Sequence, residues 1–181
     1  MNFRRPEIWL ITGIPAAGKT TVARALAARL ERSAHIEGEQ LWQQIVAGRE
    51  TPSATTLEGE TERQYELVIR NQCLLARSYA EAGFTPILDF VVVTRSHLEA
   101  YMNYLAGGAL RVVALTPSLD IVAQRDAARG GKTGSTWSPL DETLRTELSG
   151  TGLWLDTSTL TVEQTVDAIL ERAEDALVRR V

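Results

Sequence analysis

The sequence predicts an α/β fold in which a five-stranded parallel sheet carries helices on both faces. Short apolar strand patterns alternate with amphipathic helical patterns through most of the 181 residues. Strands connected through helices lie parallel and are covered on both faces. In addition, a glycine-rich turn joins the first strand pattern directly to the first helical pattern. The length suits one domain that spans residues 1–181.

The pattern Gly-x-x-x-x-Gly-Lys-Thr occupies residues 13–20, between an apolar strand pattern at 8–12 and a helical pattern at 21–30. This arrangement is typical of a phosphate-binding loop, whose glycines let the backbone curl around an anion. Lys19 is expected to reach the β- and γ-phosphates, and the Thr20 hydroxyl to ligate Mg²⁺. The nucleotide-binding residues predicted are Gly13, Ile14, Pro15, Ala16, Ala17, Gly18, Lys19, Thr20 and Thr21. The sequence therefore predicts a site for ATP or GTP together with Mg²⁺.

The other four strands are expected where compact apolar or β-branched stretches occur, at residues 35–37, 84–89, 110–115 and 153–155. Pro86 fits best near the start of its strand, because proline cannot donate a hydrogen bond within a sheet. Ligands of such sheets bind beyond the carboxyl ends of the strands. Residues that follow these strands are therefore candidates for function.

Helices are expected between the strands, and several begin at capping residues. Residues 116–117, Thr-Pro, provide an N-cap and a first-turn proline for a helix that runs to about Arg129. Residues 138–139, Ser-Pro, begin a short helix. Residues 161–164 form a capping box for the last helix, whose buried face is expected to extend to Leu177. The remaining helical patterns lie at residues 38–46, 65–79 and 96–105.

Composition excludes several classes of protein. The net charge of −4 and the pI near 5.3 argue against a non-specific nucleic-acid binder. The one cysteine, Cys73, rules out an internal disulfide and fits a reducing cytosol, so a cytoplasmic location is expected. No apolar stretch approaches the length of a membrane span, so no membrane partner is expected.

Two acidic residues near predicted strand ends are candidates for catalysis. Glu39 follows the second strand, where it could take the proton of an acceptor hydroxyl, and Glu37 competes for the same role. Asp89 ends an apolar strand, where it could ligate the metal or act as the base. The structural alternatives are that Glu39 complements a helix dipole and that Asp89 caps a turn.

A cationic group is predicted to close over the transferring phosphoryl group as a small lid at about residues 126–140. Arg125 and Arg129 share one helical face that leads into a glycine-rich loop containing Lys132. The alternative is that these charges complement a helix C-terminus. Two further interpretations concern possible site residues: His35 and His97 are taken as structural, whereas Trp42 could stack on a substrate or pack in the core.

The chain resembles the small P-loop kinases, and within them the chloramphenicol phosphotransferase-like branch, with gluconate and shikimate kinases as relatives. The resemblance rests on residues 10–26, on Gly38-Glu39, on the arginine-rich lid and on residues 155–158. It spans nearly the whole chain and implies a three-layer P-loop NTPase fold. It also implies transfer of the γ-phosphoryl group to a hydroxyl of a small molecule. In that group the residue at the position of Glu39 is usually Asp.

The acceptor candidates are an antibiotic, a sugar acid or a nucleoside, and antibiotic inactivation follows from the resemblance alone. The rival hypothesis is a regulatory or switch NTPase that hydrolyses or senses the nucleotide without an acceptor. The sequence lacks an Asn-Lys-x-Asp guanine-reading motif and an Asp-x-x-Gly switch after the loop. The choice between ATP and GTP, the oligomeric state and the base among Glu37, Glu39 and Asp89 are left open by the sequence.

Overall fold

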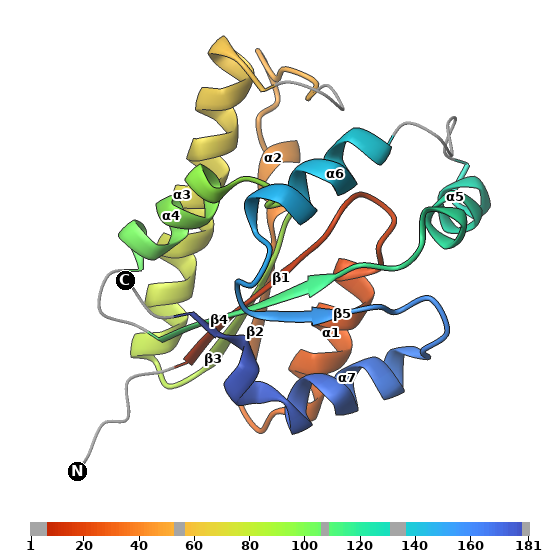
Figure 1. Cartoon of the computed structure of the whole chain (residues 1–181). Helices are drawn as coiled ribbons and strands as arrows, with labels where there is room; N and C mark the ends of the chain where they lie inside the picture. The colour runs from red at the N-terminus through yellow and green to blue at the C-terminus, as the bar shows by residue number, and fades with distance from the viewer. Residues whose placement is uncertain (1–6, 53–56, 106–108, 131–136, 179–181) are drawn as a thin grey trace.

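The computed structural model describes residues 7–52, 57–105, 109–130 and 137–178. A central sheet lies between two layers of helices (Figure 1). Its five parallel strands run in the order β2-β3-β1-β4-β5. They are β1 (Glu7–Thr12), β2 (Ser33–Glu37), β3 (Thr85–Asp89), β4 (Ala109–Leu115) and β5 (Leu153–Leu155). The predicted α/β class and its five parallel strands are confirmed.

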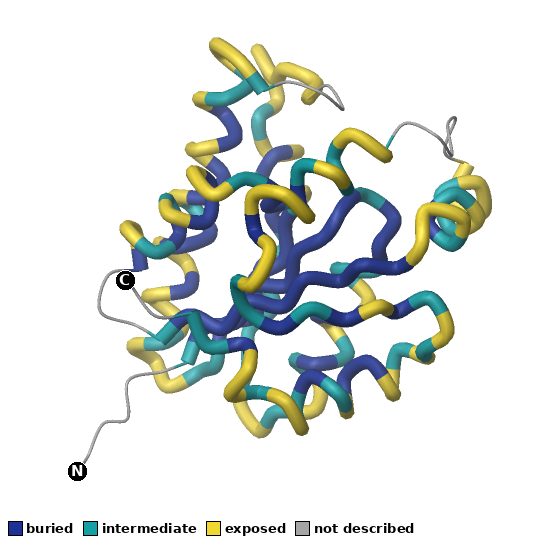
Figure 2. Tube along the Cα trace, in the orientation of Figure 1, coloured by how far each residue is buried: buried dark blue, intermediate teal, exposed yellow. Residues whose placement is uncertain are grey.

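The alternation of side chains along β1 explains why helices cover both faces. Leu10 packs with one core cluster, whereas its neighbours Trp9 and Ile11 pack with the other. Both clusters are closed by helices, and the strands are buried between them (Figure 2). Figure 1 shows α1 (Lys19–Arg29) and α7 (Val162–Glu171) over one face and α3 (Gly59–Glu81) and α4 (Arg95–Tyr104) over the other.

The other three α-helices of the described chain lie near the carboxyl ends of the strands, the edge where ligands of parallel sheets bind. They are α2 (Gly38–Gln43), α5 (Leu119–Ala128) and α6 (Ser138–Glu147). The strand register places the carboxyl ends of β1, β2 and β3 side by side, because Ile11 and Glu37 both pair with Asp89. The loop after β1 therefore emerges beside the ends of β2 and β3.

The end of the chain differs from the predicted continuous helix. The helix α7 ends at Glu171, a 3-10 turn follows at Ala173–Ala176, and Leu177 lies in β6 (Leu177–Val178), antiparallel to β4. The short strand β5 covers only the carboxyl half of β4, which leaves the edge at Arg111 to pair with Leu177. Leu177 therefore pairs with the free edge of β4 and does not continue the helix that the sequence pattern predicts.

Two predicted helix starts shift by one or two residues, and one is confirmed. The N-cap of α5 is Ser118, whose hydroxyl accepts from the Ile121 N–H, whereas the Thr116 N–H and hydroxyl both donate to the Leu155 carbonyl. The N-cap of α6 is Trp137, so Ser138 is the first helical residue. The capping box at the start of α7 is present. Within the described residues, no helix combines the length and apolarity needed to cross a membrane.

Candidate active site

The glycine-rich loop between β1 and α1 has the backbone conformation that its sequence predicts. Gly13 and Gly18 have φ values of 146° and 100°, which non-glycine residues rarely adopt. A Cβ atom on Gly13 would also lie 2.6 Å from the carbonyl oxygen of Leu115. Ala16 adopts a φ of 62°, a conformation that costs a non-glycine residue about 1–3 kcal/mol and that recurs at functional sites.

Lys19, the first residue of α1, turns back over this loop. Its Nζ donates a hydrogen bond to the carbonyl of Ile14 at 3.0 Å. Burial lowers the pKa of Lys19 to about 8, while the negative charges of Asp89 and Glu39 act in the opposite direction. The ammonium group is therefore poorly solvated, so a polyanion bound in the loop would stabilise its charged form.

Thr20 and Asp89, the two predicted metal ligands, are in contact. The Thr20 hydroxyl donates to the Asp89 Oδ1 at 3.1 Å, and Asp89 is only 2% exposed. Within the described residues, no group of three or more His, Cys, Asp or Glu side chains could hold a metal by itself. One hydroxyl and one carboxylate fit Mg²⁺, which takes one or two protein ligands and completes its shell with water and phosphate oxygens.

His35, which the sequence indicated to be structural, contacts the candidate metal ligand Asp89. Its Nε2 lies 2.5 Å from the Asp89 Oδ2, so that both carboxylate oxygens of Asp89 are engaged. The strands explain the contact. His35 pairs with Ile87, and Asp89, two residues further along β3, has its side chain on the same face of the sheet as Ile87. The signal was present in the sequence as alternation within two strands, but it becomes readable only once β2 and β3 are known to be neighbours.

Glu37 and Glu39 occupy different environments. The Glu37 carboxylate accepts hydrogen bonds from Arg24 at 2.9 Å and from Gln40 at 2.8 Å. Glu39, in the first turn of α2, is exposed and accepts a longer bond of 3.3 Å from Gln43. Glu39 also lines a cavity among the described residues, which Glu37 does not.

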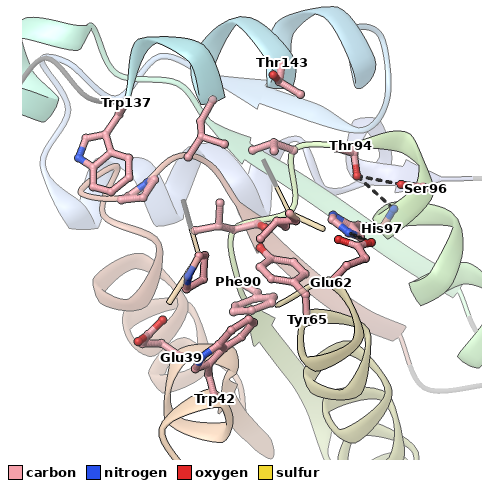
Figure 3. A pocket seen from close by; sticks show the side chains of 16 residues that line it. Glu39, Trp42, Glu62, Tyr65, Phe90, Thr94, Ser96, His97, Trp137 and Thr143 are labelled. Carbon is pink, nitrogen blue, oxygen red and sulfur yellow. Dashed lines mark hydrogen bonds and ion pairs between the residues drawn. The ribbon is translucent and has the colours of Figure 1, made fainter. Parts of the chain in front are cut away.

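That cavity has a volume of about 510 Å³ and begins at Pro15 of the loop (Figure 3). Its floor consists of aromatic rings: Tyr65 lies 5.5 Å from Trp42 and 4.5 Å from Phe90, measured between ring centroids. Trp42 packs in the core and also lines the cavity, so its stacking on a substrate stays a prediction. Side chains near α6 form another wall, namely Trp137, Leu140 and Thr143.

Glu62 and His97 form the end of the cavity away from Glu39, as Figure 3 shows. The His97 Nε2 lies 2.9 Å from the Glu62 Oε1, and its ring stacks on Tyr65 with centroids 4.7 Å apart. Sequence reasoning took His97 as structural and did not single out Glu62. The two residues come from α3 and α4, and no local pattern reveals that these helices pack together.

The two predicted lid arginines lie in different settings. Arg125 donates to the carbonyl oxygens of Ala17 and Thr157, both at 3.1 Å, and so connects α5 to the loop and to the segment after β5. Arg129 is close enough to Lys19 for its charge to lower the lysine pKa. Residues 131–136 of the predicted lid, including Lys132, lie outside the described residues.

Comparisons with solved structures show the fold of P-loop kinases. The Deinococcus radiodurans tunicamycin resistance protein is 23% identical, with a TM-score of 0.68, over 98% of this chain and 100% of that one. A gluconokinase from Sinorhizobium meliloti 1021 is 21% identical, with a TM-score of 0.65, over 96% and 95%.

An APS kinase from Mycobacterium tuberculosis, solved with AMPPNP and APS, is 18% identical, with a TM-score of 0.70, over 94% of this chain and 98% of that one. A search of curated proteins found no match to this sequence. The predicted P-loop kinase fold is thus confirmed, whereas the nearer likeness to chloramphenicol phosphotransferases stays a prediction.

The family model AAA_33, described as an AAA domain, matches residues 8–151. This range contains the phosphate-binding loop, the Thr20–Asp89 contact and the whole described wall of the cavity. The chain belongs to the AAA_33 family.

Proposed function

We propose that the protein is a kinase that transfers the γ-phosphoryl group of ATP or GTP to a hydroxyl of a small molecule. One observation carries the proposal: the phosphate-binding loop opens at Pro15 into a cavity of about 510 Å³ that also contains the carboxylate of Glu39. A nucleotide-hydrolysing switch needs no such second compartment, whereas a kinase must hold two substrates side by side.

The nucleotide would be held by residues 13–21. Backbone N–H groups of the loop and the N-terminus of α1 provide donors for phosphate oxygens, and Lys19 adds a positive charge. Thr20 and Asp89 would hold Mg²⁺, with His35 orienting the carboxylate. When bound, Mg²⁺ neutralises negative charge on the phosphates.

Glu39 is the best-placed general base. The acceptor hydroxyl would give its proton to the Glu39 carboxylate while its oxygen forms a new bond to the γ-phosphorus. The bond from that phosphorus to the β-γ bridging oxygen breaks, and the nucleoside diphosphate leaves. Glu37 is neutralised by Arg24, and both oxygens of Asp89 are engaged, so neither is as free to take this proton.

Arg125 and Arg129 would support the transferring group from α5. Arg125 already bonds to the loop carbonyl of Ala17, and the charge of Arg129 reaches Lys19. Positive charges here would offset the negative charge of the transition state. Exclusion of water by the walls of the cavity would limit wasteful hydrolysis.

The test is a screen of hydroxylated antibiotics, sugar acids and nucleosides with ATP or GTP and Mg²⁺, in which product mass is measured. A mass increase equal to one phosphoryl group, seen with the wild-type protein but not with Lys19→Ala, supports the proposal. Rapid nucleotide hydrolysis that no acceptor accelerates would instead support the regulatory NTPase. The names of the structural neighbours, a tunicamycin resistance protein and a gluconokinase, support including antibiotics and sugar acids in the screen.

A further inference from the structure

The Asp, Glu, Lys and Arg side chains described along the acceptor cavity are all acidic. Among the described residues that line it, Glu39 and Glu62 are acidic and none is Lys or Arg. The field of these carboxylates is felt at the floor, since burial, Glu39 and Glu62 together raise the pKa of Tyr65 well above its usual value. A carboxylate or phosphate on the acceptor would lose its hydration here and meet like charges.

The floor offers apolar surface in place of hydrogen-bond partners. The rings of Trp42, Tyr65 and Phe90 lie against one another. The Tyr65 hydroxyl donates its hydrogen bond to the carbonyl of Val91 and so cannot donate one to an acceptor molecule. Aliphatic residues complete the surface: Leu57, Val91, Val93 and Leu140. A polyhydroxylated sugar would bury hydroxyls without partners on this floor, whereas an aromatic or aliphatic body would gain from contact with it.

Glu62 differs from the apolar floor because it keeps a polar group available at the far end. Its side chain is 33% exposed, whereas that of His97 is 5% exposed. The contact with His97 uses the Oε1 of Glu62. The second carboxylate oxygen can therefore accept a hydrogen bond from a molecule in the cavity, and the negative charge would strengthen that bond.

Polar atoms on the cavity wall are also left unsatisfied. In the described part of the chain, the Nδ1 of His97 and the Nε1 of Trp137 are buried without a hydrogen-bond partner. Leaving such an atom without a partner is costly, so native proteins contain few of them. Both residues line the cavity, whereas the third such atom in the described chain, the Thr157 Oγ1, belongs to a residue that does not.

We infer that the acceptor is an uncharged or cationic molecule with an aromatic or similarly apolar body, carrying a hydrogen-bond donor that Glu62 binds at the end of the cavity opposite Glu39. This inference rests on the proposed function, since it specifies the substrate class of the same site. It selects against sugar acids and phosphorylated acceptors. The donor and the reacting hydroxyl would lie at opposite ends of the aromatic floor (Figure 3).

Direct binding tests the inference without requiring turnover. The probes are four alcohols with one phenyl ring: phenylalaninol, which is cationic; N-acetylphenylalaninol and phenylpropanediol, which are neutral; and phenyllactate, which is anionic. Gluconate is the polyhydroxylated anion. Each is titrated by calorimetry into the full-length protein with the non-hydrolysable analogue AMPPNP and Mg²⁺. The inference predicts that phenylalaninol and the neutral probes bind at least about tenfold more tightly than phenyllactate, and that gluconate binds weakest.

The Glu62→Gln variant tests whether the preference among the probes depends on the carboxylate of Glu62. It should reduce the preference for phenylalaninol over phenyllactate at least about tenfold, whereas Glu62→Asp should retain most of it. Glu66→Gln is the matched control, because Glu66 lies one turn further along α3, is exposed and does not line the cavity.

Tighter binding of phenyllactate or gluconate, no binding of the phenyl probes, or an unchanged preference in Glu62→Gln would overturn the inference. Failure of the proposed function is a separate result: the probes would bind with this preference, yet no acceptor in the screen would gain a phosphoryl group.

Discussion

The Thr20 hydroxyl and the Asp89 carboxylate lie 3.1 Å apart, although 69 residues separate them in the chain. The contact joins the start of α1 to the end of β3, and it exists because β1 and β3 are neighbours in the sheet. It assembles an oxygen-donor pair beside the phosphate-binding loop. Asp89→Asn should therefore raise the Mg²⁺ concentration needed for half-maximal activity about 10–100-fold. Measurement of rate against Mg²⁺ concentration checks this, with Asp120→Asn as an exposed control.

Lys19→Ala should lower turnover at least about 100-fold, because its charge serves the phosphates of the nucleotide. The fold should survive, since the substitution removes a partly buried ammonium whose pKa is lowered by desolvation. Steady-state kinetics and circular dichroism together check both parts. Arg29→Ala, on the same helix, 51% exposed and bonded to Asp167, is the control. Turnover of Lys19→Ala at the wild-type level would refute the role of the loop.

The lowered pKa of Lys19 makes stability depend on pH. Between its folded pKa of about 8 and its unfolded value of 10.5, the unfolded chain binds more protons at this residue than the folded one. Stability contributed by Lys19 therefore rises with pH across this window, by up to about 3 kcal/mol. Urea unfolding of wild type and Lys19→Met at pH values below and within the window measures it. The wild-type free energy of unfolding should gain on that of the variant as the pH rises, and a constant difference would contradict the burial of this charge.

Glu39→Gln should reduce kcat about 10²–10⁴-fold while changing acceptor affinity little, as expected for loss of a general base. Glu37→Gln should reduce kcat far less, because Glu37 is bound to Arg24 and Gln40. Kinetics of the two variants side by side, with a common acceptor, decide between them. A larger loss in Glu37→Gln would transfer the role to that residue.

Gly38→Ala should disturb the acceptor cavity, because the added Cβ would lie 2.5 Å from the Phe90 ring. Overpacking of this kind costs about 1–3 kcal/mol of stability, and displacement of Phe90 should raise the KM for the acceptor more than that for the nucleotide. Thermal melts and KM values for both substrates test the prediction. Gly48→Ala is the comparison, since its added Cβ would contact nothing within 4 Å, although its φ of 75° adds backbone strain.

The sequence was most informative where the chemistry is local. Gly13 to Thr20 form one continuous segment, so their spacing predicts both the loop and the helix that follows it. The same holds for the capping box at Thr161, whose partner Gln164 is three residues away.

Features built from distant segments could not be predicted in this way. The contact of His35 with Asp89 depends on which strands are neighbours, and the Glu62–His97 pair depends on the packing of α3 against α4. Strand β6 has the same origin: it pairs with the edge of β4 that β5 leaves open. Alternation and periodicity give each element its faces, but they do not state which faces meet.

The fate of a radiolabelled γ-phosphoryl group tests the central claim most directly. The labelled nucleotide is incubated with Mg²⁺, the wild-type protein and the best acceptor from the screen, and the products are separated by chromatography. The account predicts that label appears on the acceptor hydroxyl, at a rate that falls with Lys19→Ala and with Glu39→Gln. Release of the label only as inorganic phosphate, at a rate independent of every acceptor, would contradict it.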